Sequence, residues 1–78
     1  MSQTLVLEFL EIEEILNNIN IDHSKRFSQE FFYIKTTLFS GKYDVEKIKQ
    51  LLTRINIDNG HMFDEEFKYI FGVLDMLE

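Results

Sequence analysis

Hydrophobic residues recur along this chain at alternating spacings of three and four, with polar residues between them. This is the spacing of one face of an α-helix, which turns once every 3.6 residues or so. Outside the segments that follow it, no strand-like alternation persists, and the chain has no Pro. The pattern therefore predicts an all-α fold of four amphipathic helices. The apolar positions are Leu5, Phe9, Ile12, Leu16 and Ile19; Phe31, Ile34 and Leu38; Val45, Ile48, Leu52 and Ile55; and Phe67, Ile70, Leu74 and Leu77.

The second half of the chain repeats the first at a constant offset of 36 residues. Residues 16–39 and 52–75 are identical at eleven positions. This density of identity indicates a duplicated helix-loop-helix unit, with one copy over about 5–39 and the other over about 43–77. The identical pairs are Leu16/Leu52, Ile19/Ile55, Asn20/Asn56, Ile21/Ile57, Asp22/Asp58, Phe27/Phe63, Glu30/Glu66, Phe31/Phe67, Tyr33/Tyr69, Ile34/Ile70 and Leu38/Leu74.

Two helical hairpins are too few for an open solenoid, which needs at least about three stacked units. A chain of 78 residues also has room for one small core. We therefore expect a single helical domain over residues 1–78, in which the two repeated helix-loop-helix hairpins form a small four-helix bundle with approximate internal twofold symmetry.

Residues typical of helix ends stand at the ends of the predicted helices. Ser28, Asp44 and Asp64 are placed to cap the second, third and fourth helices with a side-chain oxygen. Gly41 is placed to end the second helix, because Gly adopts the left-handed conformation common at that position.

The repeated loop residues have structural roles in this prediction. The Asn and Asp side chains are expected to bond to loop backbone amides, and the Ile and Phe side chains to pack the loops onto the end of the bundle. The residues are Asn20, Asp22, Asn56 and Asp58 for the hydrogen bonds, and Ile19, Ile21, Phe27, Ile55, Ile57 and Phe63 for the apolar contact.

Each loop carries Asn, then Asp two residues later, and a Glu-Phe pair opens the next helix. A helix-loop-helix motif that occurs twice with these residues resembles the paired EF-hands of calcium-binding proteins. The resemblance implies Ca²⁺ ligands at Asn20, Asp22 and Ser24. An EF-hand loop also has Gly at its sixth position and a bidentate Glu at its twelfth. Counted from Asn20, Lys25 is sixth and Glu30 eleventh, so this loop departs from the family pattern at both.

Two histidines raise the question of a zinc site, in which imidazole and carboxylate groups bind the ion. They are not equivalent in the repeat, because His23 aligns with Asn59 and His61 aligns with Lys25. A site made by duplication keeps its ligands in register. We therefore expect neither a metal site nor another cofactor.

The sequence offers no catalytic motif. The chain has no Cys, and no Ser stands in a motif for nucleophilic attack. The Gly residues do not form a phosphate-binding loop, which needs several at fixed spacing before a helix. The chain is predicted not to be an enzyme.

Composition narrows the range of partners. Fourteen acidic residues against eight basic ones give a net charge of −6, which disfavours nucleic acid and anionic membrane surfaces as partners. No run approaches the roughly 20 apolar residues that span a bilayer. A small domain without Cys suits a reducing compartment, so we expect a cytoplasmic protein.

Acidic residues gather in the first and fourth helices, which are neighbours in an up-down bundle. Their outer faces are therefore expected to merge into one negative surface that binds a partner. Four of the eight basic residues, Lys42, Lys47, Lys49 and Arg54, are assigned to the third helix. The candidate acidic contacts are Glu8, Glu11, Glu13, Glu14, Asp64, Glu65 and Asp75.

The fourth helix also has more apolar residues than one face can bury. Tyr69, Val73 and Met76 form a second stripe, and Phe32 and Phe39 are a similar surplus in the second helix. Either these helices are buried deeply within the monomer, or they present an apolar patch to another chain, and we favour the patch. Tyr69, Val73 and Met76 are therefore candidate partner contacts.

Together these features predict a non-catalytic acidic protein-interaction module. We expect a small inhibitor, immunity-type or regulatory protein that binds a basic protein surface. One alternative is a homodimeric structural or adaptor module that pairs through its apolar stripes. A second alternative is a divergent EF-hand-like pair with weak or no calcium binding.

Overall fold

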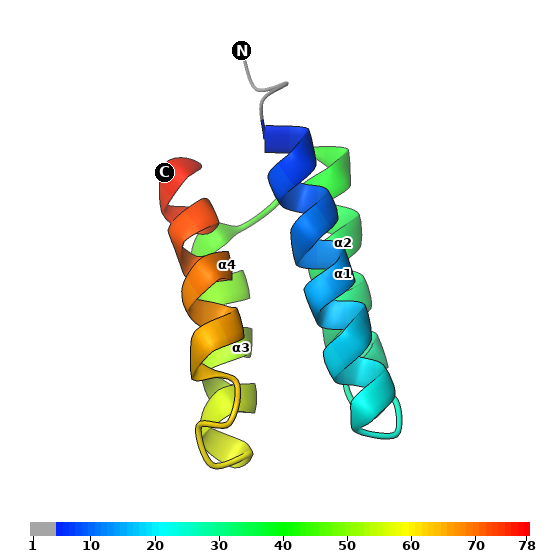
Figure 1. Cartoon of the computed structure of the whole chain (residues 1–78). Coiled ribbons are helices and arrows are strands. Elements are labelled where there is room, and N and C mark those ends of the chain that lie inside the picture. Colours follow the sequence, from blue (N-terminus) through cyan, green and yellow to red (C-terminus); the bar gives the residue numbers. More distant parts are fainter. Residues whose placement is uncertain (1–4) are drawn as a thin grey trace. The chain divides into compact units, whose positions relative to one another are not determined.

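The structure is a computed structural model that describes residues 5–78. Its helices are α1 (Val6–Asp22), α2 (Ser28–Ser40), α3 (Val45–Asp58) and α4 (Asp64–Met76), and residues 5–78 contain no strand (Figure 1). The predicted all-α fold is confirmed. None of these helices combines the length with the continuous apolar character that crossing a bilayer needs.

The chain divides into two compact units between Tyr43 and Asp44. We call them hairpin 1, which contains α1 and α2, and hairpin 2, which contains α3 and α4. Within each hairpin the two helices contact each other. The division falls between the two predicted repeat units, so the predicted pair of helix-loop-helix hairpins is confirmed.

The two hairpins bury the same positions of the repeat. Seven pairs of equivalent residues are buried, and each residue is at most 7% exposed. The Phe27 and Phe31 rings of hairpin 1 have centroids 5.4 Å apart and planes at 41°, and the Phe63 and Phe67 rings of hairpin 2 have the same values. The repeat in the sequence is therefore a repeat in packing. The pairs are Ile12/Ile48, Leu16/Leu52, Ile19/Ile55, Phe27/Phe63, Phe31/Phe67, Ile34/Ile70 and Leu38/Leu74.

Each hairpin loop turns through two consecutive residues in the left-handed conformation. They are Ser24 (φ 60°) and Lys25 (φ 58°) in hairpin 1, and Gly60 (φ 68°) and His61 (φ 60°) in hairpin 2. Gly adopts this conformation readily, whereas residues with a Cβ adopt it at a cost. The same backbone bond closes both turns, from the second of these residues to the carbonyl of Asn20 or Asn56 at 2.7 Å.

A repeated Asn side chain fastens each turn to the following helix. Asn20 Oδ1 accepts a hydrogen bond from the Phe27 backbone N–H at 2.9 Å, and Asn20 Nδ2 donates to Ser28 Oγ at 2.9 Å. The Asn56 side chain bonds at 2.8 Å to the equivalent backbone N–H and at 2.6 Å to Asp64 Oδ1. The prediction that Ser28 and Asp64 cap α2 and α4 is therefore wrong, because Asn20 and Asn56 engage their side chains instead.

The predictions for the start of α3 and the end of α2 are confirmed, and the predicted packing of the loops is partly wrong. Asp44 caps α3 by accepting a bond from the Lys47 backbone N–H at 3.2 Å, and Gly41 ends α2 with φ 79°. Of the residues predicted to pack the loops, Ile19, Phe27, Ile55 and Phe63 are at most 7% exposed. Ile21 and Ile57 are 64% and 57% exposed, so the prediction is wrong for these two. Both lie in the last turn of a helix, two residues beyond a buried Ile, and two residues carry a side chain about 200° around the helix axis.

Candidate functional site

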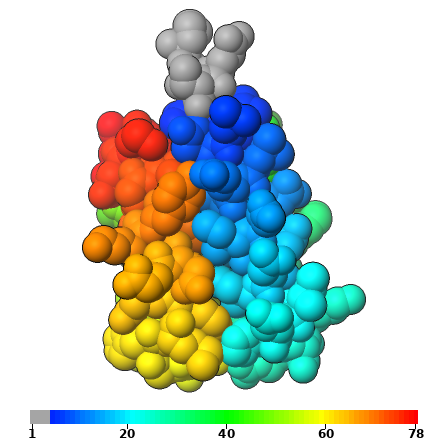
Figure 2. All heavy atoms as spheres, in the orientation of Figure 1, coloured from blue at the N-terminus to red at the C-terminus, as the bar shows by residue number. Residues whose placement is uncertain are grey.

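Four of the predicted acidic contacts lie on α1, a helix that contains no Lys or Arg. Glu11 and Glu14 are exposed, whereas Glu8 and Glu13 are half-buried. Glu8 Oε1 is buried and accepts no hydrogen bond from the described residues. Of these four carboxylates, Glu11 and Glu14 are therefore the ones exposed to a partner. α1 lies in front of α2 in Figure 1, and its side chains cover the face of hairpin 1 turned to the reader in Figure 2.

Apolar side chains are exposed beside these carboxylates. Val6 is 49% exposed, Leu7 72% and Leu10 46%. Leu7 and Glu11 are four residues apart on the helix, as are Leu10 and Glu14, so the members of each pair are neighbours on its surface. We call these five residues the α1 face. The helical spacing alone does not single out its apolar members. A signal is present, because five of the residues from 5 to 10 are apolar and one stripe cannot hold them all.

The acidic residues at the start of α4 also act within their own helix. Asp64, Glu65 and Glu66 form its first turn and are exposed. No side chain caps this end of α4, and negative charge there interacts favourably with the unbonded backbone amides. Asp64 Oδ1 also lies 3.7 Å from His61 Nδ1, a pair that is ionic when His61 is protonated. The Asp64 side chain therefore contacts Asn56 and His61 and also lies at the N-terminus of α4.

Asp75 joins α4 to α3. Its Oδ1 accepts a hydrogen bond from Lys49 Nζ at 2.6 Å, and Glu78 lies 3.5 Å from the same ammonium. The hydrogen bond to Asp75 and the charges of the two carboxylates raise the pKa of Lys49 above its ordinary value of 10.5. The Asp75 side chain remains 63% exposed, so it also faces the solvent.

Two members of the predicted apolar stripe on α4 are exposed and the third is buried. Met76 is 60% exposed and Tyr69 37%. Val73 is 3% exposed and belongs to the core, so its prediction as a surface contact is wrong. Val73 lies three residues after the buried Ile70, within the broad apolar face that a packed helix turns inwards.

Hairpin 2 has a groove between α3 and α4 with a volume of about 560 Å³. This falls within the size range of small-ligand sites. Its apolar lining comes from Ile57, Phe67 and Phe71, with Gly72 beside them. The polar lining residues are Thr53, Asn56, His61, Asp64, Lys68 and Asp75. Two predicted acidic contacts, Asp64 and Asp75, therefore border this groove.

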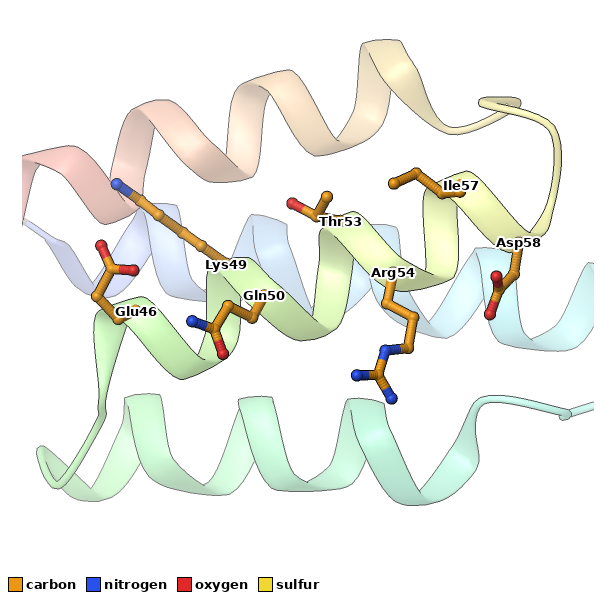
Figure 3. Close-up of a pocket in the computed structure, with 7 residues that line it drawn as sticks. All are labelled: Glu46, Lys49, Gln50, Thr53, Arg54, Ile57 and Asp58. Carbon is orange, nitrogen blue, oxygen red and sulfur yellow. The ribbon is translucent and has the colours of Figure 1, made fainter.

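A second hollow, of about 460 Å³, runs along α3 (Figure 3). Figure 3 shows Lys49, Thr53 and Ile57 pointing to the side of α3 on which α4 lies. Charges of both signs border this hollow, so it favours neither a cation nor an anion. Its lining residues are Glu46, Lys49, Gln50, Thr53, Arg54, Ile57 and Asp58.

The loop side chains compared with EF-hand ligands have other contacts. Asn20 and Asp22 lie in the last turn of α1, not in an open loop. The Asn20 side chain is bonded to Phe27 and Ser28. Asp22 and its counterpart Asp58 are exposed and do not bond to the loop amides, so that prediction is wrong for both. Among residues 5–78, no group of three or more His, Asp or Glu side chains is placed to hold a metal ion. The need to fasten the turn thus accounts for the repeated Asn without a cation.

The predicted merger of the acidic faces of α1 and α4 involves both hairpins and stays a prediction. Within its own hairpin each set has a different setting, because the α1 acids lie beside exposed aliphatic residues and the α4 acids border the groove. No family model, curated protein or solved structure matches the chain.

Proposed function

We propose that the chain is a non-catalytic protein-interaction module that binds a basic protein surface, as small inhibitors, immunity-type proteins and regulatory proteins do. The observation that supports this most is the α1 face, on which exposed carboxylates and exposed aliphatic side chains alternate without a basic residue in the helix. We place this activity in the cytoplasm, because the chain has no Cys for disulfides.

The two kinds of side chain on the α1 face make different contributions to such an interface. The apolar ones, of which Leu7 is the most exposed, supply the surface whose burial drives association. The acids Glu11 and Glu14 attract Lys and Arg, which speeds the encounter and selects against acidic partners. A net charge of −6 on 78 residues extends this attraction beyond the contact itself.

The test is the rate of association with a basic partner at rising salt. Proteins captured from the source cells by the immobilised chain are identified, and the rates are measured from about 50 to about 500 mM salt, where the screening length falls several-fold. The proposal predicts basic proteins whose association rate falls roughly tenfold or more. A rate that does not depend on salt would contradict it.

A pair of variants separates the α1 face from net charge. Glu14→Lys and Asp58→Lys change the net charge equally, but Asp58 is exposed at the end of α3. We expect Glu14→Lys to weaken binding several-fold more than Asp58→Lys. Equal losses would assign the effect to overall charge and remove the α1 face from the proposal.

A second candidate function is self-association, favoured by the exposure of large apolar side chains on α2 and α4. Phe32 is 65% exposed, Phe39 47% and Met76 60%. Sedimentation equilibrium over a wide concentration range tests this directly. A homodimer through these residues predicts a mass twice that of the chain, and Phe32→Ser restores the monomer; a monomer throughout the range removes this candidate.

A further inference from the structure

The groove of hairpin 2 lies where the two hairpins differ in sequence, although they bury the same core positions and turn in the same way. At the repeat offset, Thr53 and Phe71 of the groove align with Asn17 and Lys35 of hairpin 1. Lys35 Nζ donates a hydrogen bond to Asn17 Oδ1 at 2.7 Å and so bridges α1 and α2 at this level. Thr53 and Phe71 cannot form such a bridge. Hairpin 2 therefore stays open where hairpin 1 is spanned.

Gly72 keeps the same part of the groove open. It lies within α4, is exposed, and has no atom within 4 Å of where a Cβ would be. Neither an unusual backbone conformation nor close packing requires Gly here, and Gly weakens a helix relative to Ala. Its counterpart Thr36 has a side chain that bonds back to the carbonyl of Phe32 at 2.8 Å. The absence of a side chain at Gly72 leaves room for one from a partner.

The charged residues at equivalent positions of the two hairpins also differ. At the two ends of the groove hairpin 2 has Asp64 and Asp75, where hairpin 1 has Ser28 and Phe39. Lys68 lies on the border of the groove, and Lys49 is paired with Asp75 and shared with Glu78. Asp64 and Asp75 each make one hydrogen bond across the hairpin, and a carboxylate accepts about four. Both carboxylates therefore have acceptor capacity for a cationic partner.

We propose that this groove binds a basic protein segment by taking one large apolar side chain between Phe71 and Gly72 while flanking Lys or Arg residues reach Asp64 and Asp75. The two carboxylates belong to residues eleven positions apart on α4, roughly 16 Å along the helix. The segment thus carries two basic groups about this far apart, with an aromatic or large aliphatic residue between them. The proposal rests on the proposed function and names a second contact for it, on hairpin 2.

The experiment is a selection of random peptides of about 15 residues, displayed against the immobilised full chain, a length that spans the roughly 16 Å between the two carboxylates as a helix. We expect the enriched peptides to carry a large apolar residue flanked by Lys or Arg. Their affinity is then measured for a closed variant, T53N/F71K/G72T, which gives hairpin 2 the residues of hairpin 1 at these positions. Hairpin 1 shows that the repeat accommodates all three, and far-UV circular dichroism checks the fold.

A second variant tests the charges with the groove left open. D64N/D75N retains the shape of both side chains and removes both negative charges. We expect T53N/F71K/G72T to lower affinity tenfold or more at any salt concentration. We expect D64N/D75N to lower it several-fold at low salt and less at high salt, because screening removes its effect.

Three results overturn the groove. They are enriched peptides without the apolar residue or without basic residues, equal affinity for T53N/F71K/G72T and the unaltered chain, and no enrichment at all. Basic peptides that bind T53N/F71K/G72T normally but lose affinity for Glu14→Lys refute the groove and leave the proposed function standing. Enrichment of acidic peptides refutes both.

Discussion

The side chains of Asn20 and Asn56 are predicted to hold the two hairpin turns in place, and their removal tests the equivalence of the repeats. Each makes two hydrogen bonds, one to a part-buried backbone N–H of the following helix. A net value of about 0.5–1.5 kcal/mol for each bond gives a loss of about 1–3 kcal/mol for Asn20→Ala. Asn56→Ala loses at least as much, since one of its bonds is to the Asp64 carboxylate.

Such a loss is large for this chain, because about 0.05–0.15 kcal/mol per residue gives a total of roughly 4–12 kcal/mol. Urea unfolding followed by far-UV circular dichroism measures it. With a slope near 1 kcal/mol per M, a loss of about 2 kcal/mol lowers the midpoint by about 2 M.

Asn18→Ala is the matched control, because Asn18 is an exposed residue of the same helix and gains the same helix propensity from Ala. We expect it to change the free energy of unfolding by less than about 0.5 kcal/mol. If Asn20→Ala and Asn56→Ala are no more destabilising than Asn18→Ala, the turns do not depend on these side chains and the reasoning is refuted.

Three further predictions concern the core, the groove and one ion pair. Ile34 and Ile70 are both 0% exposed, so Ile34→Ala and Ile70→Ala are each expected to lower the free energy of unfolding by about 2–5 kcal/mol in urea titrations; a loss below 1 kcal/mol for either would contradict the repeated core. Gly72→Ala is expected to raise it by about 0.5–1 kcal/mol, because a Cβ there meets open space, and a decrease would show a constraint at this site. The pKa of Lys49 is raised by its hydrogen bond to Asp75, so its stabilisation is complete below pH 10.5 and is lost as the pH rises through the higher folded-state value. The difference in Tm between the unaltered chain and Lys49→Met is therefore expected to disappear in strongly alkaline solution, and a constant difference would refute the assignment.

Much of the fold follows from local patterns in the sequence. The spacing of Ile12, Leu16, Ile34 and their copies predicts which faces are buried, because a helix of 3.6 residues per turn brings these positions together. The cap at Asp44 and the end at Gly41 follow from short-range chemistry that involves a few neighbouring residues. These features need no knowledge of distant contacts.

The errors arise from contacts in three dimensions that a local sequence pattern does not describe. Ser28 is a good capping residue in isolation, but Asn20, eight residues earlier, lies close enough to engage its hydroxyl. A narrow apolar stripe places Val73 on the surface, whereas the face that α4 buries is broad enough to include it.

The groove was missed for a related reason, since its depth depends on which side chains fail to fill the space between two helices. The sequence does contain a signal for it. Phe71 and Gly72 differ from Lys35 and Thr36 at equivalent positions of two otherwise similar hairpins. Differences between copies can therefore locate a site that similarity alone does not show.

The most direct test of the account compares the backbone amide shifts of Gly72 and Thr36 by NMR. These equivalent positions lie in the open and the bridged hairpin, and a selected basic peptide with a central Phe is titrated into the full chain. We expect the Gly72 resonance to move in a saturable way while that of Thr36 stays in place. Equal movement of both resonances, or movement of Thr36 alone, would contradict it.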